Sequence, residues 1–503
     1  MGKIFNLSEL EKIVLKKKKQ GKKFVLCHGV FDILHVGHLN YLKSAKKVAD
    51  FLIVTLTTDK YIKKGFGRPF FNQKQRAEML SSLKIVDFVS YCNEPSAVKA
   101  IKTIKPNFYA KGIEYKDSKN DLTKKIILEK RVLKKHKGKM VFINEPTFSS
   151  SKIINQTSNI FNAQQKTFLD KIKKNYSFAQ IVHYLQKLRK LKVTILGELI
   201  IDRYIFCDAL GKSGKEPYLA FKELFYEDYI GGSGAIARQL SEFNRNINLI
   251  TNYGNDKFNT LINRDLNKTI SRKFVYNKNS KNILKKRYID NISRHKVFGS
   301  YKYDETNEQK SHSALLKIIK NSLKNSDLLI ISDYGHGLIN NKISSEICNS
   351  KKFISLNAQV NAANIGYHTI RKYTNIDSLI INETELRHEL RDKISNVDAL
   401  SKKLLKQMKI KNLVVTMGTN GALIMNDKFK TIKCPAFSST YIDKVGAGDS
   451  MLGVMSLCLR AGMPNDLTLF LGSIIGGLSV QILGNKDSVK YNDFLRTIEF
   501  SIK

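Results

Sequence analysis

The feature that most constrains this fold is a repeated pairing of a short apolar run with a helical pattern. Residues 24–27 and 51–56 are apolar runs of strand length, and residues 38–49 between them have the pattern of a helix. The same alternation returns in the second half of the chain, with apolar runs at residues 327–333 and 413–416. Strands that alternate with helices form a parallel sheet covered by helices on both faces. The sequence therefore predicts an α/β fold throughout.

The length of the chain calls for more than one such sheet. A single hydrophobic core stops growing at roughly 250–300 residues, whereas this chain has 503. The spacing of the apolar runs predicts a helical N-terminal extension, a first Rossmann-like α/β domain, a polar helical linker and a larger second α/β domain. We place these parts at residues 1–21, 22–155, 156–190 and 191–503, respectively.

The net charge of +42 raises the question of nucleic-acid binding. Proteins that bind nucleic acid through phosphate contacts cluster their Lys and Arg residues. Here the lysines are spread along the chain, with one dense run at residues 16–23. We therefore expect small anionic substrates as partners and no nucleic acid. The sequence does not determine whether the protein is a monomer or a homo-oligomer.

The sequence favours neither a metal-binding protein nor a membrane-spanning protein. The six cysteines are scattered and form no CxxC pair, which argues against a metal site built from protein ligands and for a reducing, cytoplasmic location. The stretch 467–485 carries no charge, but it contains Thr468, Ser473 and several glycines. A buried helix is therefore expected there rather than a membrane span, and the N-terminus shows no signal-peptide pattern.

The first candidate site is the segment 29–38, with the sequence GVFDILHVGH, between a predicted strand and a predicted helix. Ligands of open α/β sheets bind at the carboxyl ends of strands, where a helix N-terminus offers free N–H groups to a phosphate. His35 and His38 are three positions apart, so both can reach the same triphosphate. Gly37 between them lets the backbone come close to the ligand. Two surface histidines beside a turn are the alternative interpretation.

This segment resembles the HxGH cytidylyltransferase-like superfamily. Similar family patterns occur in the same order at residues 67–69 (GRP), 75–78 (QRAE), 111–115 (KGIEY) and 148–153 (FSSSKI). The resemblance implies a nucleotidyltransferase in which His35 and His38 are catalytic. It implies nucleotide contacts from Gly29, Phe31, Asp32, Gly37, Lys111, Ser150 and Ser151, and a substrate contact from Arg68.

The reaction that this resemblance implies has no covalent enzyme intermediate. A phosphate oxygen of a sugar or polyol phosphate attacks the α-phosphorus of ATP or CTP, and pyrophosphate leaves. The protein positions the reactants and stabilises charge, as in phosphoryl transfer generally. Mg²⁺ is expected to bridge the phosphates.

The second candidate site is the segment 443–449 (DKVGAGD), which precedes an apolar helix at residues 450–459. The backbone N–H groups of Gly446, Ala447 and Gly448 can converge on an anion at the start of this helix. Asp449 can then accept a proton from a substrate hydroxyl that attacks the γ-phosphate of ATP. A glycine-rich helix cap that contains Asp is the alternative interpretation.

The second half of the chain resembles the ribokinase-like sugar kinases over residues 192–500. This resemblance rests on the order of Gly231–Gly232, the NETE segment at 382–385, the TMGTNG segment at 416–421 and the glycine-rich segment before Asp449. It implies that Asp449 is the catalytic base and that Asn382 and Glu385 organise Mg²⁺ and phosphates. Nucleotide contacts are further implied for Gly418, Gly421, Gly446, Ala447 and Gly448, and sugar contacts for Asp202, Gly231 and Gly232.

Segments 202–204 (DRY), 215–217 (KEP) and 332–334 (SDY) look closest to the kinase branch found in bifunctional ADP-heptose synthases. In that family a heptose 7-phosphate kinase is fused to a heptose 1-phosphate adenylyltransferase for lipopolysaccharide precursors. Here the order of the two halves is reversed, and Ile236 and Asn357 stand where the family usually has other residues. These departures leave the sugar open. Two alternatives remain, namely a different sugar or polyol phosphate with CTP, and a non-catalytic binding protein that keeps both folds.

Overall fold

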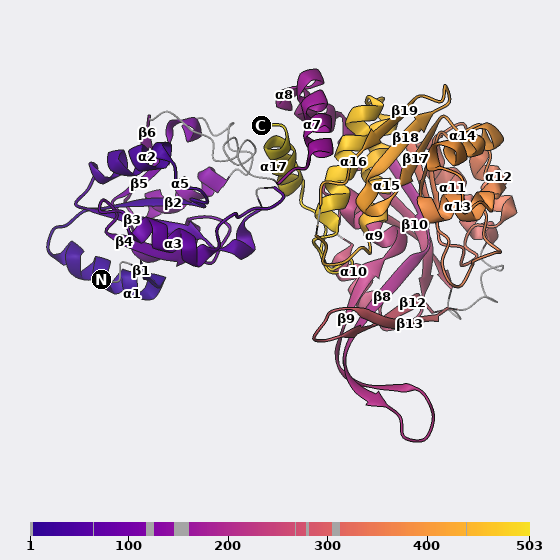
Figure 1. Cartoon of the computed structure of the whole chain (residues 1–503), viewed down its shortest axis with the longest axis horizontal. Helices are drawn as coiled ribbons and strands as arrows, with labels where there is room; N and C mark the ends of the chain where they lie inside the picture. Colours follow the sequence, from indigo (N-terminus) through magenta and orange to yellow (C-terminus); the bar gives the residue numbers. More distant parts are fainter. Residues whose placement is uncertain are drawn as a thin grey trace. The chain divides into compact units, whose positions relative to one another are not determined.

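The chain folds into two compact units (Figure 1). The structure is a computed structural model that describes residues 4–63, 65–116, 125–144, 160–266, 268–277, 281–303, 312–438 and 440–503. The first unit comprises residues 1–162 together with the last nine residues, Leu495–Lys503, and the second comprises Ala163–Phe494.

A six-stranded parallel sheet forms the centre of the first unit. Its strands, in spatial order, are β1 (Ile4–Phe5), β4 (Phe88–Cys92), β3 (Phe51–Thr57), β2 (Phe24–Gly29), β5 (Phe108–Gly112) and β6 (Lys139–Ile143). The chain adds β3 and β4 on one side of β2 and then crosses to place β5 on the other side. The sheet order therefore reverses at β2, and such a switch point is where open α/β sheets bind ligands.

Helices cover both faces of this sheet, and each face has its own apolar cluster. Leu42, Val54 and Leu80 belong to one cluster, and Leu10, Leu26 and Ile101 belong to the other. The described helices of this part are α1 (Leu7–Lys19), α2 (Val36–Lys46), α3 (Gln73–Ser81), α4 (Val98–Ile104) and α5 (Lys125–Lys135). Burial on both faces explains why the strands are continuous apolar runs without polar alternation.

A nine-stranded sheet forms the centre of the second unit. It is parallel except for two antiparallel strands at one edge. In spatial order its strands are β11 (Ile270–Asn277), β10 (Ile247–Gly254), β7 (Val193–Gly197), β14 (Leu328–Asp333), β15 (Phe353–Ala358), β16 (Ser378–Asn382), β17 (Asn412–Thr416), β18 (Ala422–Asn426) and β19 (Thr431–Cys434). Strands β10 and β14 lie on opposite sides of β7, so the order of this sheet reverses at β7.

Helices flank this sheet along the length of the second unit. Those described are α7 (Ala163–Asn175), α8 (Phe178–Leu188), α9 (Gly232–Leu240), α10 (Asn259–Asp265), α11 (His312–Lys324), α12 (Asn341–Cys348), α13 (Glu383–Leu390), α14 (Val397–Met408), α15 (Ala447–Arg460) and α16 (Asn465–Ser479). Helix α17 (Tyr491–Ser501) begins in the second unit and ends in the first. Helices α7 and α8 cover much of the stretch that we expected to be a linker, and their apolar residues Phe168, Ile172, Ile181 and Leu185 are buried.

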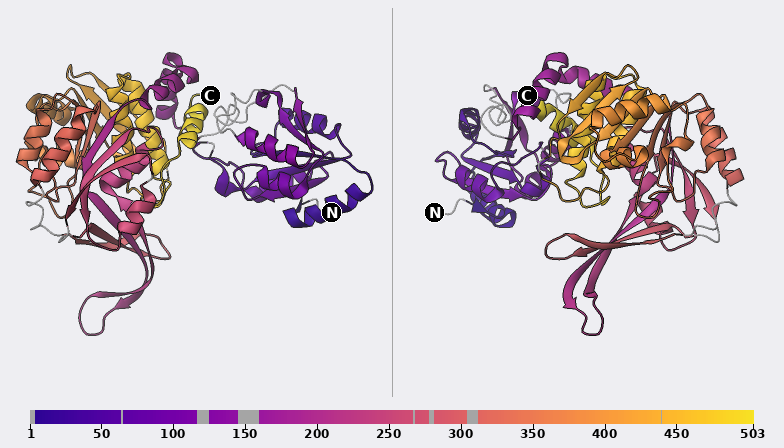
Figure 2. Two further views of the ribbon diagram at one scale, coloured as in Figure 1. Left: turned by 180° about the vertical axis from the view of Figure 1, so that it is seen from behind. Right: turned by 45° about the vertical axis from the view of Figure 1, so that its right-hand side comes forward.

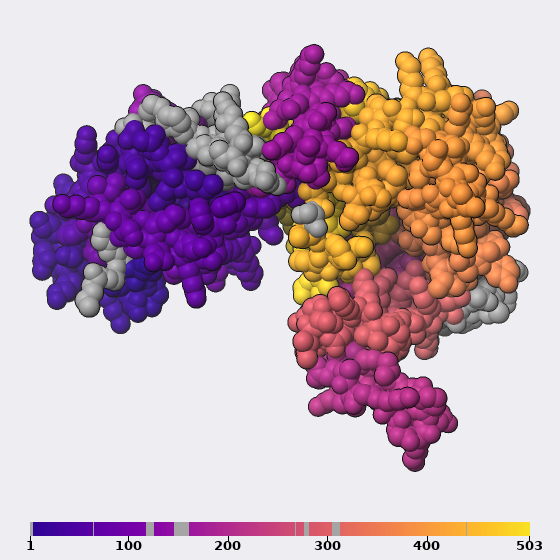
Figure 3. All heavy atoms as spheres, in the orientation of Figure 1, coloured from indigo at the N-terminus to yellow at the C-terminus, as the bar shows by residue number. Residues whose placement is uncertain are grey.

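A separate four-stranded sheet, which the sequence pattern did not predict, projects from the second unit. Its order is β13 (Lys296–Lys302), β12 (Ile283–Asp290), β8 (Leu199–Lys212) and β9 (Leu219–Gly231). Figure 2 shows from two sides that β8 and β9 continue as a long hairpin, and the space-filling view in Figure 3 shows its tip extending beyond the rest of the unit. We refer to this sheet as the lid sheet.

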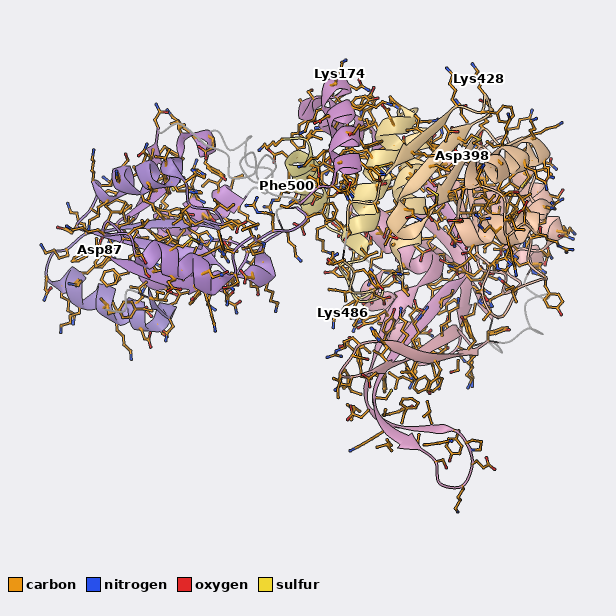
Figure 4. The ribbon with its side chains drawn as sticks, in the orientation of Figure 1. Asp87, Lys174, Asp398, Lys428, Lys486 and Phe500 are labelled. Carbon is orange, nitrogen blue, oxygen red and sulfur yellow. The ribbon has the colours of Figure 1, made fainter. Side chains whose placement is uncertain are left out.

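The uncharged stretch at 467–485 forms most of the 15-residue helix α16, which begins at Asn465, and the turns after it. Nearly all residues of α16 are buried, and it packs against α15, so the prediction of a buried helix is confirmed. Within the described ranges, no helix has both the length and the apolar character needed to cross a membrane. Charged side chains such as Lys174 and Lys428 lie exposed on the outside of the second unit (Figure 4).

Candidate active sites

The first site forms at the carboxyl end of β2, where the first sheet changes order. His35 is the N-cap residue of α2, with extended backbone dihedrals, and the N–H of His38 donates to the carbonyl of His35 at 2.9 Å. This first turn brings the two imidazole rings to 3.9 Å between centroids, in a nearly stacked arrangement. Burial lowers the pKa of His35, which favours the neutral imidazole at pH 7. The structure thus brings both predicted histidines to one helix N-terminus.

Asp32 connects this turn to a second loop. Its buried carboxylate accepts hydrogen bonds from the backbone N–H groups of Phe70 (2.8 Å) and Phe71 (3.0 Å), and it forms an ion pair with Arg68. The side chains of Asp32 and Arg68 are only 1% and 2% exposed. We expected Asp32 to contact the nucleotide and Arg68 to contact the other substrate. The structure pairs these two side chains with each other, and the pair joins the loop after β2 to the loop before α3.

Lys111 reaches the same edge of the sheet from the neighbouring strand. Strands β2 and β5 are parallel partners, with Cys27 opposite Ala110, so Lys111 lies level with the end of β2. Its ammonium group is 3.8 Å from a carboxylate oxygen of Glu129, which also accepts hydrogen bonds from Ala97 N–H and the Tyr109 hydroxyl. Glu129 thus orients Lys111. Ser150 and Ser151 lie outside the described residues.

The second site is a cavity of about 580 Å³ at the carboxyl ends of the large sheet. This volume lies within the usual range of roughly 300–1,000 Å³ for small-molecule sites. Residues from β8, α13, the loop between β17 and β18 and the start of α15 line it together. The predicted residues among them are Asp202, Gly232, Asn382, Glu385, Gly418, Gly421, Gly446, Ala447, Gly448 and Asp449. Gly231 does not line the cavity, but it packs against Asp202.

The glycine-rich segment has the geometry of an anion site. Gly446 has φ +86° and precedes α15, and a Cβ there would lie 2.3 Å from Oδ1 of Asn485. A Cβ on Gly448 would meet no atom within 4 Å, because this position faces the open cavity. The N–H groups of the first turn of α15 are therefore available to a phosphate, with the positive end of the helix dipole behind them.

Asp449 lies in that first turn and faces the cavity. Burial raises the pKa of its carboxyl to about 6. The hydroxyl of Tyr334 and the positive charges of Lys285 and Arg287 counteract this rise, while the negative charge of Asp202 adds to it. A carboxylate with a pKa near the working pH can both accept and release a proton, as a general base must.

Asn382 and Glu385 form a capping box at the start of α13. Asn382 Oδ1 accepts a hydrogen bond from Glu385 N–H at 2.8 Å, and Glu385 Oε2 accepts one from Asn382 N–H at 2.9 Å. Glu385 is 5% exposed, and burial raises its pKa to about 7. The box orients two oxygen-bearing side chains at the cavity wall, near the N-terminus of α15.

Comparison with known families agrees with this geometry. The model of the pfkB family carbohydrate kinases matches residues 190–490, which is more than half of the chain. The chain belongs to the pfkB family of carbohydrate kinases. The cytidylyltransferase-like family model matches residues 26–156. A pfkB kinase domain is therefore joined to a nucleotidyltransferase-type domain, and the predicted pair of α/β folds and enzyme classes is confirmed.

Two solved structures resemble the pfkB kinase part. Ribokinase from Thermotoga maritima is 18% identical with a TM-score of 0.50, and the match covers 61% of this chain and 99% of that chain. Phosphofructokinase-2 from Escherichia coli is 16% identical with a TM-score of 0.50, covering 62% of this chain and 100% of that chain. At such identity, the likeness establishes the fold.

Curated relatives match a smaller part of the chain. The bifunctional protein HldE of Campylobacter fetus subsp. fetus is 44% identical over 119 residues, which are 23% of this chain and 25% of that protein. HldE of Campylobacter jejuni subsp. doylei is 38% identical over 162 residues, or 30% of this chain and 33% of that protein. The matches thus span only a quarter to a third of these relatives' own length. They agree with the expected resemblance to the ADP-heptose synthases.

The structure also adds residues to the pfkB site that the sequence did not single out. Lys285 and Arg287 of β12 line the cavity, because β12 pairs in parallel with β8 and places Lys285 opposite Asp202. Arg287 forms an ion pair with Asp202, and Lys285 is 6% exposed. In the sequence these residues belong to an ordinary basic strand, ILKKRYID. Lys285 and Arg287 are two positions apart, and side chains at this spacing lie on the same face of a strand. This spacing was the indication that the sequence offered.

Proposed function

We propose that this chain catalyses two reactions, the phosphorylation of a sugar phosphate by ATP in the second unit and nucleotidyl transfer to a sugar 1-phosphate in the first. The observation that carries the kinase proposal is the position of Asp449 in the first turn of α15, at the wall of the cavity. Asp202, Lys285 and Arg287 line the same cavity, and their charges act on the Asp449 carboxylate.

The cavity residues divide into a nucleotide end and a sugar end. Apolar and small residues from the segment after β19, from α15 and from α16, among them Phe437, Met451 and Gly476, offer a surface suited to a purine ring. The buried Lys285 and the partly exposed Arg287 offer two cations that line the same cavity beside Asp202. Two cations next to one another suit a doubly charged anion, so we infer that the accepted sugar already carries a phosphate.

In the proposed kinase reaction, the substrate hydroxyl gives its proton to Asp449 while its oxygen attacks the γ-phosphorus of ATP, and ADP leaves. The N–H groups at the start of α15 stabilise the charge on the transferred group. Bound Mg²⁺ would neutralise the phosphates. Asn382 and Glu385 fit it as oxygen-bearing residues, since Mg²⁺ commonly binds one or two carboxylates together with substrate phosphates. No group of three or more His, Cys, Asp and Glu side chains among the described residues could hold a metal ion by itself.

In the proposed transferase reaction, His35 and His38 bind the triphosphate at the N-terminus of α2, and Lys111 adds a positive charge from β5. A phosphate oxygen of the sugar 1-phosphate attacks the α-phosphorus, and pyrophosphate leaves. The resemblance to HldE proteins supports ATP as the nucleotide and a heptose phosphate as the sugar. The kinase substrate that we propose is D-glycero-D-manno-heptose 7-phosphate.

The test uses the purified full-length chain with each reaction assayed separately. ADP release is followed with ATP and heptose 7-phosphate, and pyrophosphate release with ATP or CTP and heptose 1-phosphate. Asp449→Asn should lower the kinase rate by roughly 10²–10⁴-fold and leave pyrophosphate release unchanged. His38→Asn should have the converse effect. The substrate assignment would be overturned if pyrophosphate were released with CTP but not with ATP. It would also be overturned if the kinase accepted another sugar phosphate but not heptose 7-phosphate. Full kinase activity in Asp449→Asn would overturn the catalytic assignment.

A further inference from the structure

Tyr334 contacts the catalytic carboxylate from a part of the chain outside the glycine-rich segment. It follows β14 directly, and its hydroxyl donates a hydrogen bond to Oδ1 of Asp449 at 2.8 Å. The side chain is 3% exposed and lines the cavity. A buried tyrosine hydroxyl that donates to a carboxylate forms one of the stronger kinds of hydrogen bond in proteins.

The backbone on both sides of Tyr334 is held by buried side chains. The N–H groups of Tyr334 and His336 donate to the two carboxylate oxygens of Glu198, at 2.9 and 3.1 Å. The carbonyl oxygen of Tyr334 accepts hydrogen bonds from the side-chain amides of Asn361 and Asn364, at 2.9 and 2.8 Å. Both polar backbone groups of Tyr334, the N–H and the carbonyl oxygen, are therefore hydrogen-bonded, and this restricts the position of its side chain.

A second buried carboxylate strengthens the same turn. Asp333 is 1% exposed and accepts hydrogen bonds from Gly335 N–H (3.0 Å) and the Tyr373 hydroxyl (2.6 Å), and its carboxylate also pairs with the ammonium group of Lys372 at 2.6 Å. Gly335 has φ +69°, and a Cβ there would lie 2.5 Å from the Asn364 amide. A buried polar network whose members are hydrogen-bonded in this way rigidifies the turn that carries Tyr334.

We propose that Tyr334 is a positioning residue for the kinase reaction, and that it engages Oδ1 of Asp449 so that Oδ2 faces the substrate and takes the proton. The proton moves from the substrate hydroxyl to Oδ2, the substrate oxygen bonds to the γ-phosphorus, and the bond from that phosphorus to the departing ADP oxygen breaks. This inference rests on the proposed kinase function.

Among the described residues, charged groups on three elements packed around Asp449 interact with it electrostatically. Asp202 lies on β8, Lys285 and Arg287 lie on β12, and Glu385 lies on α13. All of these remain when only the Tyr334 hydroxyl is removed. The loss of that donor destabilises the ionised carboxylate, so the pKa of Asp449 rises.

The test compares Tyr334→Phe with the full-length parent, using ATP and D-glycero-D-manno-heptose 7-phosphate. The acid limb of the kinase pH profile should move up by about one pH unit, since a hydrogen bond to a charged group has roughly that effect. At pH 7 this shift alone lowers the ionised fraction of Asp449 only about two-fold. The loss of positioning should therefore appear as a larger fall in kcat, about ten-fold, with a smaller change in KM for the sugar phosphate.

Tyr301→Phe is the matched control. The Tyr301 ring lies 5.2 Å from the Lys285 ammonium group, much as the Tyr334 ring lies 5.4 Å from it, but Tyr301 belongs to the lid strand β13. Removing its hydroxyl should leave the acid limb in place. An acid limb and kcat unchanged in Tyr334→Phe, or moved equally by Tyr301→Phe, would overturn the proposal.

A second measurement separates this inference from the choice of sugar. The infrared carboxyl band that disappears in Asp449→Asn can be titrated without substrate, in the parent and in Tyr334→Phe. A higher midpoint in Tyr334→Phe supports the contact, even if heptose 7-phosphate is not a substrate. An identical midpoint refutes it, even if the parent phosphorylates that sugar.

Discussion

The ion pair between Arg287 and Asp202 offers a quantitative test of how the kinase site is held together. The Asp202 side chain is 5% exposed and that of Arg287 is 21% exposed. Asp202 Oδ2 also accepts a hydrogen bond from Asn485 at 3.2 Å. A Cβ on Gly231 would lie 2.3 Å from the same oxygen, so the carboxylate is tightly enclosed. Arg287→Met keeps most of the aliphatic stem and removes the charge.

Removing one partner of a buried ion pair costs roughly 3–5 kcal/mol, because the other charge stays buried without it. Since Arg287 is partly exposed, we expect the lower end, about 3 kcal/mol. This corresponds to more than about a hundred-fold in the unfolding equilibrium of the second unit. The double variant Asp202→Asn with Arg287→Met removes both charges and should regain most of this free energy.

Hydrogen exchange at increasing urea concentration, followed by mass spectrometry, measures the opening free energy of β8 and β12 peptides. Peptides from β2 and β3 serve as an internal control, because they belong to the other unit. Lys433→Met is the matched surface control, because its pair with Asp398 is 61% and 41% exposed and should contribute less than about 1 kcal/mol. A loss below about 1 kcal/mol in Arg287→Met, or a double variant as unstable as the single one, would refute the reasoning.

Three further predictions concern the turn, the base and the metal of the kinase unit. Gly421→Ala should destabilise this unit by more than about 2 kcal/mol, since φ is +85° and the new Cβ would lie 2.1 Å from the Cys434 carbonyl oxygen. Gly418→Ala, with φ +58° and no atom within 4 Å, should cost only about 1 kcal/mol in the same urea titration. The kinase rate should fall as the pH drops through about 6, because Asp449 must be ionised to accept a proton; a rate independent of pH there would count against its role. Chelation by EDTA should abolish both activities and Mg²⁺ should restore them; full activity in EDTA would contradict the magnesium assignment.

The local parts of both sites could be predicted from the sequence. His35, Gly37 and His38 occupy one helix turn, and Gly446 to Asp449 occupy another, so their geometry follows from contiguous residues and from the position of a helix after a strand. The capping box of Asn382 and Glu385 is similarly local. A short segment with such constraints adopts nearly the same shape wherever it occurs.

Other contacts could not be predicted, because they join residues far apart in the chain. Tyr334 reaches Asp449 across 115 positions, and Arg287 reaches Asp202 across 85. The last nine residues group with the first unit, although they follow the whole kinase segment in the sequence. No periodicity or spacing in the sequence encodes such pairings.

The sequence by itself predicted the two α/β sheets, the two helix N-termini that we propose as phosphate sites, and Asp449 as the proposed base. Apolar periodicity and glycine placement set these features through short-range sterics and backbone hydrogen bonding. Only the tertiary structure decided that the lid sheet brings Lys285 and Arg287 over Asp202, and that Tyr334 engages one oxygen of Asp449. Strand pairing and side-chain packing over long sequence distances decide these contacts. The substrate preference that we propose therefore depends on the packed fold, while the reaction types follow from the local motifs.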